Sequence, residues 1–390
     1  MPEIHRQKIL IITRNLPPLV GGMERLNWHM ADELSKYAEV KVIGPSDAET
    51  SIPKNVSFKG VPLKPLSRFL ILGFWRTIQL ARHWKPDIVL AGSGLTAPLA
   101  LFAARLTNAK AVAYVHGLDI AASHPVYKAL WIPAIRHLDK VIANSNPTAK
   151  LVEQQGVESS RISIVFPGVS LPLPTHGDAA EFRNDYNLGT GQLLLSIGRL
   201  TTRKGLREFV NHALPDIVEQ HPDVLLVVIG EAPKDSLHAQ VQTQKSIQAV
   251  ADAKGIGKHL RFLGVITDSH TLSSAYRAAS VHVFPVREIP GDPEGFGMVA
   301  IEAAAHGLPT VAFATGGVTD AVAVERSGYL AAPADYIALK GLVLQILSNN
   351  SISWEASTTL FAQNFSWTVM GRLVIEALSF SKPKKCSPKN

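Results

Sequence analysis

The sequence predicts an α/β protein made of two doubly wound domains that face each other across a cleft. Short apolar, β-branched runs alternate with helical segments along the 390 residues, which is typical of parallel sheets covered on both faces. The chain is long enough for two domains that each bury a core. Residues 169–189 are first proline-rich and then polar, which indicates a linker. We therefore expect domains at 1–175 and 176–355, a closing helix at 356–380, and a basic disordered tail at 381–390.

Five apolar runs predict the strands of the first domain. They are Lys8–Thr13, Val40–Ile43, Ile88–Leu90, Ala111–Val115 and Val141–Ala143. The uncharged stretch at 88–104 is near the minimum length of a membrane span, but Gly92, Gly94 and Pro98 divide it. It is therefore predicted as a strand, a loop and a buried helix.

Five further runs predict the second sheet, namely Leu193–Ile197, Leu225–Ile229, Leu260–Leu263, Val281–Phe284 and Thr310–Ala314. The long polar segment Leu237–Lys258 is predicted to be helical. The segment Trp354–Phe380 is predicted to form one or two closing helices.

The most informative stretch is PEGFGMVAIEAAAHG at 293–307. It places Glu294 in a glycine-flanked loop after a strand and Glu302 on the helix that follows. Gly295 and Gly297 let backbone N–H groups approach a ligand at the start of this helix, where a phosphate would bind. Each carboxylate can accept two hydroxyl hydrogen bonds, which suits a sugar or ribose diol. The plain alternative is that acidic residues lie near a helix N-terminus for dipole reasons.

Two other loops that follow predicted strands are suited to phosphate. Gly21 and Gly22 open a helix after the first strand, and a tight turn is the alternative to a phosphate site there. In GRLTTRKG, Arg199 and Lys204 follow a strand and could hold a diphosphate, and solvated surface cations are the alternative.

His116 ends a buried strand in YVHGLD. Ligands of doubly wound sheets bind beyond the carboxyl ends of strands, which favours a functional histidine over a structural one. Asp119 either caps a turn or orients this histidine.

These motifs together resemble the retaining glycosyltransferases of family 4, which have the GT-B fold. The resemblance covers about residues 8–375. It implies that Glu294 meets the donor sugar, that Glu302 binds the nucleotide ribose, and that the loop with Gly295, Phe296 and Gly297 binds the diphosphate. Bacterial cell-envelope and polysaccharide mannosyltransferases are the most similar group. In this fold the final helix crosses back to the first domain.

By the same resemblance, Gly21 and Gly22 lie at the donor phosphate, Arg199 and Lys204 neutralise the diphosphate, and His116 stabilises charge as the glycosidic bond breaks. These roles make His116, Glu294, Arg199 and Lys204 the expected catalytic residues. The family is considered retaining, through a front-face displacement in which the leaving phosphate accepts the acceptor's proton.

The positive charge of the chain is concentrated in its first half. Residues 1–170 hold 20 Lys and Arg against 12 Asp and Glu, whereas the whole chain has a net charge of +7. Between Pro62 and Lys85 basic and aromatic residues interleave without any acid, which is compatible with contact to an anionic membrane. A surface helix with snorkelling basic side chains is the alternative. No nucleic-acid motif accompanies the charge, so nucleic acid is not an expected partner.

The sequence therefore predicts transfer of a hexose, with mannose favoured, from a GDP- or UDP-sugar to a glycan or a lipid-linked acceptor. No Asp-x-Asp is present, so neither a metal nor another cofactor is expected. The single cysteine, Cys386, and the absence of an evident signal peptide favour a cytoplasmic protein, peripheral at the inner membrane face. Three alternatives stay open: a GT-B epimerase or phosphorylase, a nicotinamide dehydrogenase that lacks the usual glycine fingerprint, and a non-catalytic nucleotide-sugar binder.

Overall fold

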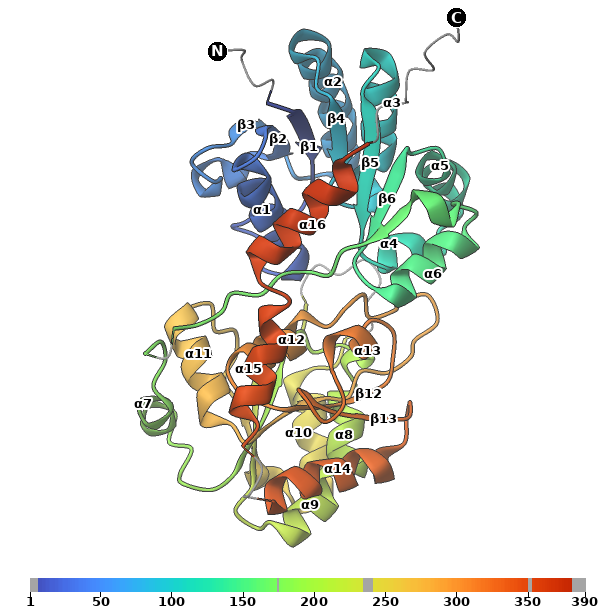
Figure 1. Ribbon diagram of the computed structural model, residues 1–390. Helices are drawn as coiled ribbons and strands as arrows, with labels where there is room; N and C mark the ends of the chain where they lie inside the picture. Colours follow the sequence, from blue (N-terminus) through green and yellow to red (C-terminus); the bar gives the residue numbers. More distant parts are fainter. Residues whose placement is uncertain (1–5, 174, 234–240, 350–352, 381–390) are drawn as a thin grey trace, which may run out of the picture.

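The computed structural model describes residues 6–173, 175–233, 241–349 and 353–380, and in it the chain forms two parallel sheets with helices on both faces (Figure 1). The first sheet has the strand order β3-β2-β1-β4-β5-β6-β7. Its strands are β1 (Lys8–Ile12), β2 (Glu39–Pro45), β3 (Ser57–Val61), β4 (Ile88–Ala91), β5 (Lys110–Val115), β6 (Lys140–Ala143) and β7 (Ile162–Ile164). The expected fold class, two doubly wound domains, is confirmed.

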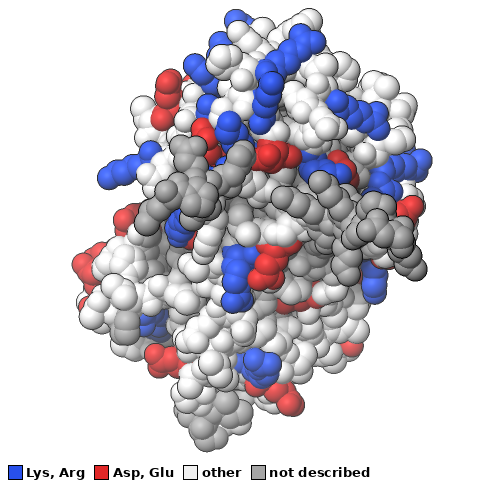
Figure 2. Space-filling model, turned by 45° about the horizontal axis from the view of Figure 1, so that its top comes forward, with Lys and Arg blue, Asp and Glu red and all other residues white. Residues whose placement is uncertain are grey.

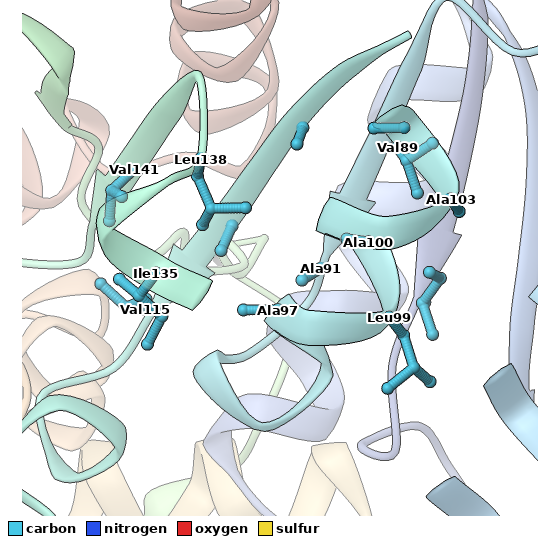
Figure 3. Packing of buried hydrophobic residues seen from close by; sticks show 14 of the residues in the cluster. Val89, Ala91, Ala97, Leu99, Ala100, Ala103, Val115, Ile135, Leu138 and Val141 are labelled. Atoms are coloured by element: carbon cyan, nitrogen blue, oxygen red, sulfur yellow. The ribbon is translucent and has the colours of Figure 1, made fainter. Parts of the chain in front are cut away.

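Helices cover both faces of the first sheet. One face carries α2 (Leu66–Trp84), α3 (Ala97–Thr107), α5 (Pro125–Arg136) and α6 (Asn146–Gln154). Alanines of α3, including Ala97 and Ala100, pack against Val89 and Ala91 of β4, so the helix approaches the sheet closely (Figure 3). The other face carries α1 (Gly22–Ser35) and α16 (Trp367–Leu378). The short α4 (Leu118–Ala121) follows β5.

The second sheet has the order β10-β9-β8-β11-β12-β13. Its strands are β8 (Leu193–Ile197), β9 (Leu225–Ile229), β10 (Leu260–Phe262), β11 (Val281–Phe284), β12 (Thr310–Phe313) and β13 (Gly328–Ala331). One face carries α8 (Leu206–His212), α9 (Leu214–Gln220), α10 (Gln244–Ala253) and α14 (Tyr336–Ser348). The other carries α7 (Ala179–Asp185), α11 (Ser269–Ala278), α12 (Met298–Ala305) and α15 (Glu355–Gln363), and α13 (Val318–Ala321) follows β12.

The closing segment contains two helices with different neighbours. The first, α15, packs on α12 of the second domain through Phe361 and Ala362. The second, α16, begins after the Ser366 cap and packs on α1 of the first domain, where Trp367 and Met370 join the core (Figure 1). The chain therefore returns to its first domain, and α16 helps to hold the two domains together. The tail at 381–390 lies outside the described residues.

Three strands were not predicted, and all three lie at or next to the edge of a sheet. These are the edge strands β3, β7 and β13, and each contains residues that are half-buried or exposed. Because one side of such a strand faces solvent, its sequence lacks the continuous apolar run that marked the central strands.

The helix predicted over Leu237–Lys258 is wrong in its extent. Residues 234–240 lie outside the described residues, and α10 covers only Gln244–Ala253. The Thr243 side chain caps its start, and Gly255, at φ +73°, lies just past its end. The stretch at 88–104 forms β4, a loop and the start of α3, as predicted. In the described part of the chain, every helix is too short or too polar to cross a membrane.

Candidate active site

The predicted site residues come from both domains and meet where the two face each other. A pocket of about 180 Å³ lies between them. The first domain lines it with Leu118, Ala122 and Ser123, and the second with Thr202, Arg203 and residues 289–292. This pocket is next to Glu294, because Arg203, which lines it, pairs with that carboxylate.

The glycine loop after β11 packs against the end of β5 in the other domain. A Cβ added to Gly295 would lie 2.2 Å from the carbonyl oxygen of His116 and 2.8 Å from Nδ2 of Asn144. Gly297 has φ +92° and forms the N-cap of α12. The Phe296 side chain is buried among Phe166 and Phe365, so only its backbone can face a ligand.

Two helix N-termini face each other at this loop. A Cβ on Gly22, at the start of α1, would lie 3.0 Å from Sδ of Met298, the first residue of α12. A Cβ added to Gly21, the N-cap of α1, would collide with the Glu24 carboxylate. Within the described chain, the N–H groups of residues 295–297 donate no hydrogen bond. An anion placed here would be favoured by free N–H groups and by both helix dipoles.

The Glu294 side chain is 11% exposed and is paired with two cations. Lys204 Nζ lies 2.8 Å from Glu294 Oε2, and Arg203 donates to the same oxygen. Arg203 also lies 3.1 Å from Asp292 through its Nε. Burial alone would raise the pKa of Glu294, but the charges of Lys204 and Arg203 outweigh it and lower this pKa to about 2. The carboxylate is therefore ionised at neutral pH.

Burial shifts the pKa of Lys204 downward, whereas it acts to raise the pKa of Glu294. Desolvation, assisted by the charge of Arg203, lowers the pKa of Lys204 to about 8 despite the opposing effect of Glu294. At pH 7 most of this lysine remains protonated, so Lys204 and Arg203 balance the carboxylates of Glu294 and Asp292. The charge of Arg199, which also acts on Glu294, leaves the cluster net positive and suited to an anionic ligand.

Both carboxylate oxygens of Glu302 accept hydrogen bonds. Arg25 of α1 donates to its Oε1, and the Tyr276 hydroxyl donates to its Oε2 at 3.0 Å. The ion pair with Arg25 joins the two domains. The Glu302 side chain is only 10% exposed, so its carboxylate lies inside the interface.

His116 lies at the predicted strand end, and a hydrogen-bond network holds it. Its Nε2 is 3.0 Å from the carbonyl oxygen of Gly92, which can only accept, so Nε2 carries a proton. Asp119 accepts from the backbone N–H groups of His116 (2.8 Å) and Gly94 (2.7 Å). Asp119 thus ties the loops after β4 and β5 together through backbone bonds and does not contact the imidazole.

Two family models match the chain in sequence. "Glycosyltransferase Family 4" matches residues 20–172, and "Glycosyl transferases group 1" matches residues 178–358. The chain belongs with the family 4-like glycosyltransferases.

The relatives of this glycosyltransferase are moderately similar. The GDP-mannose-dependent alpha-(1-6)-phosphatidylinositol monomannoside mannosyltransferase of Mycolicibacterium smegmatis is 26% identical over 385 residues, 95% of this chain and 98% of that one. The D-inositol 3-phosphate glycosyltransferase of Mycobacteroides abscessus is 31% identical over 232 residues, but the match spans only about half (49%) of its length and 59% of this chain.

A solved structure shows the same fold. The Anabaena protein HepE in complex with UDP is 19% identical, has a TM-score of 0.77, and aligns over 95% of this chain and 99% of its own. This neighbour identifies the architecture of the glycosyltransferase as GT-B.

The two predicted phosphate-binding cations have different settings. Lys204 pairs with Glu294, whereas Arg199 is exposed and makes no hydrogen bond or ion pair with described residues, although its charge acts on both Lys204 and Glu294. Their binding of a diphosphate stays a prediction. Arg203, for which the sequence indicated no role, is buried and pairs with Glu294 and Asp292. The feature of the sequence TTRKG that could have pointed to Arg203 is its position directly before Lys204, in a tight turn that ends at Gly205. Arg25 and Tyr276, the partners of Glu302, were also missed.

We expect Gly295→Ala to lower kcat/KM about a hundredfold, because misplacing catalytic groups by about 1 Å has an effect of this order. The added methyl cannot be accommodated against the His116 carbonyl without moving the loop or separating the domains. Steady-state kinetics measure the loss of kcat/KM, and urea unfolding measures any loss of stability from the displaced loop or separated domains. Gly341→Ala is the matched control, because that helical glycine has open space around it and should be neutral or slightly stabilising. Equal activity of the two variants would contradict a tight loop contact.

Proposed function

We propose that the enzyme transfers a hexose, with mannose favoured, from a GDP- or UDP-sugar to a glycan or lipid-linked acceptor, with retention of anomeric configuration and without a metal. The observation that carries the proposal is the buried cluster of Glu294, Lys204 and Arg203 beside the facing N-termini of α1 and α12. These cations and N–H groups would neutralise a diphosphate leaving group in the way that a metal does in other transferases. The UDP bound to the HepE neighbour and the GDP-mannose dependence of the relative support a nucleotide-sugar donor.

Donor binding would rearrange the cluster. The diphosphate attracts Lys204, and Glu294, released from part of its pairing, accepts a hydroxyl of the donor sugar. The bond from the anomeric carbon to the diphosphate oxygen then breaks while His116 stabilises the developing charge. The acceptor oxygen bonds to the same face of that carbon, and the leaving diphosphate takes the acceptor's proton. Polysaccharide or cell-envelope assembly supplies acceptors of this kind.

Transfer itself tests the proposal. Incubation with GDP-mannose or UDP-glucose, an extract of bacterial membrane lipids and EDTA should give a glycosylated product whose new linkage has the donor's anomeric configuration by NMR. Inversion of configuration, or activity only with added divalent cation, would contradict the mechanism. A product formed without any acceptor would favour an epimerase.

We further propose that the enzyme works at the cytoplasmic membrane face and contacts anionic lipid through α2, α3 and α5. These three helices lie side by side over one face of the first sheet and contain no Asp or Glu. Figure 2 shows Lys and Arg side chains spread over this domain. The three helices expose these cations: Arg68, Arg76, Arg82, Arg105, Lys128 and Arg136.

The same surface exposes large apolar side chains. These are Ile71, Trp75, Phe102, Leu106, Val126 and Leu130, and Trp75 is 64% exposed. Cations around apolar side chains complement an anionic bilayer. Ala122 and Ser123 of the 180 Å³ pocket directly precede α5, so a lipid-borne acceptor would reach the pocket from this side.

Changing Arg68, Arg76 and Arg82 together to glutamine should weaken binding to anionic vesicles by at least tenfold, since each basic residue near the surface contributes about 1 kcal/mol. Co-sedimentation with phosphatidylglycerol and phosphatidylcholine vesicles measures this. Trp75→Ser should also weaken binding, whereas Ile337→Ser, at an exposed apolar residue of the second domain, is the control. Equal binding of the wild type to anionic and neutral vesicles would rule out this surface.

A further inference from the structure

The ion pair between Arg25 and Glu302 connects residues 277 positions apart, one from each domain. The Arg25 side chain is 45% exposed, whereas that of Glu302 is 10% exposed. The second partner of Glu302, Tyr276, is different, because it is buried in the same domain as Glu302 and stacks on His306 with ring centroids 4.7 Å apart. Tyr276 is thus a fixed neighbour of the carboxylate, and Arg25 is a neighbour that can leave.

The proposed function gives Glu302 another task, which is to accept the two ribose hydroxyls of the donor. In the structure one of its oxygens is taken by Tyr276 and the other by Arg25. Each carboxylate oxygen can accept two hydrogen bonds, so Oε2 can receive one ribose hydroxyl while it keeps Tyr276, whereas the guanidinium of Arg25 lies over Oε1. With the carboxylate almost fully covered, the ribose can reach it only where the arginine now lies.

We propose that Arg25 is a positioning residue. In the donor-free enzyme it occupies the position at Glu302 where the donor ribose would bind, and donor binding displaces it. This inference rests on the proposed function. Arg25 then competes with the donor for Glu302, and its ion pair with Glu302 also holds the two domains together. Donor binding and domain contact are therefore linked through one carboxylate. Asp320 also joins the domains, accepting from the backbone N–H and the side-chain amide of Asn146 at 2.6 and 2.9 Å, but these bonds do not involve Glu302.

Titration calorimetry with GDP and UDP tests the exchange in wild type, Arg25→Gln, Asp320→Ala and Glu302→Gln. Removing the competing ion pair should tighten binding of the preferred nucleotide about fivefold in Arg25→Gln, the upper range for a partly exposed pair. Asp320→Ala loosens the interface without freeing Glu302 and should stay within about twofold of wild type. Glu302→Gln should bind more weakly than wild type.

A nucleotide without the diol makes the test specific. The 2′,3′-dideoxy form of the preferred nucleotide cannot use Glu302, so Arg25→Gln and wild type should bind it equally. A tighter dideoxy complex, or an equal gain in Asp320→Ala, would mean that general opening of the cleft causes the effect and would overturn the exchange. Weaker nucleotide binding by Arg25→Gln would mean that Arg25 itself binds the donor. Unchanged binding would mean that the Arg25–Glu302 ion pair does not affect donor binding. Either result would contradict the exchange. Absence of nucleotide binding by the wild type would overturn the proposed function itself.

Discussion

Replacing Lys204 with methionine should lower kcat about 10²- to 10³-fold, the effect typical of removing one preorganised group that stabilises a developing anion. The Lys204 side chain is 17% exposed, its Nζ lies 2.8 Å from Glu294 Oε2, and it is the cation that the diphosphate would attract. Methionine keeps most of the side-chain volume and removes only the charge. Lys254→Met, at an exposed lysine of the same domain, is the control and should keep wild-type kinetics.

The same lysine predicts a pH dependence. Its pKa is lowered to about 8 by burial, so the protonated form needed to bind the diphosphate is lost as pH rises through that value. Since kcat/KM reports the free enzyme, its alkaline limb should fall near pH 8. Lys204→Arg, whose guanidinium stays charged, should keep its activity above pH 8. An identical alkaline limb in wild type and Lys204→Arg would assign that limb to another group.

The two glutamates should separate kinetically, and this is the second large effect. Glu294→Ala should lower kcat by about 10²-fold or more with little loss of nucleotide affinity, because Glu294 meets the sugar and its removal leaves both cations free for phosphate. Glu302→Ala should instead weaken nucleotide binding by at least about tenfold, as expected for hydrogen bonds to a charged group.

Single-turnover rates and nucleotide affinities, measured on both variants, distinguish these roles. Glu294→Gln is a useful second variant, because it removes the same negative charge from beside Arg203 and Lys204 but keeps the side-chain volume and an amide oxygen that can accept their hydrogen bonds. Wild-type kinetics in both alanine variants would contradict the assignment of the site.

The sequence predicted the structure best where a residue type is required for a single physical reason, such as apolar residues in a strand buried on both faces. Central strands such as β5 and β9 are buried on both faces, so their apolar runs marked them within one residue at each end. The glycines of the 294–297 loop also signalled a close approach, although the atom that they approach, the carbonyl of His116 in the other domain, is known only from the fold.

Contacts between distant residues could not be predicted in this way. Arg203 looks like any surface cation in sequence, and only the fold shows that it is buried against Glu294 whereas Arg199 is not. Likewise, Arg25 and Glu302 are brought together by the packing of α1 against the start of α12. Three of the four edge strands, β3, β7 and β13, and the ends of α10 were not predicted, because partly exposed segments lack a strong hydrophobic pattern.

Binding of GDP, UDP and NAD, each measured by calorimetry with and without EDTA, tests the central claim most directly. The account predicts micromolar binding of GDP or UDP that is unchanged by EDTA, since Lys204, Arg203 and two helix N-termini supply the positive charge. Binding of NAD without either nucleoside diphosphate would contradict a nucleotide-sugar site, and loss of GDP and UDP binding in EDTA would contradict its independence of metal.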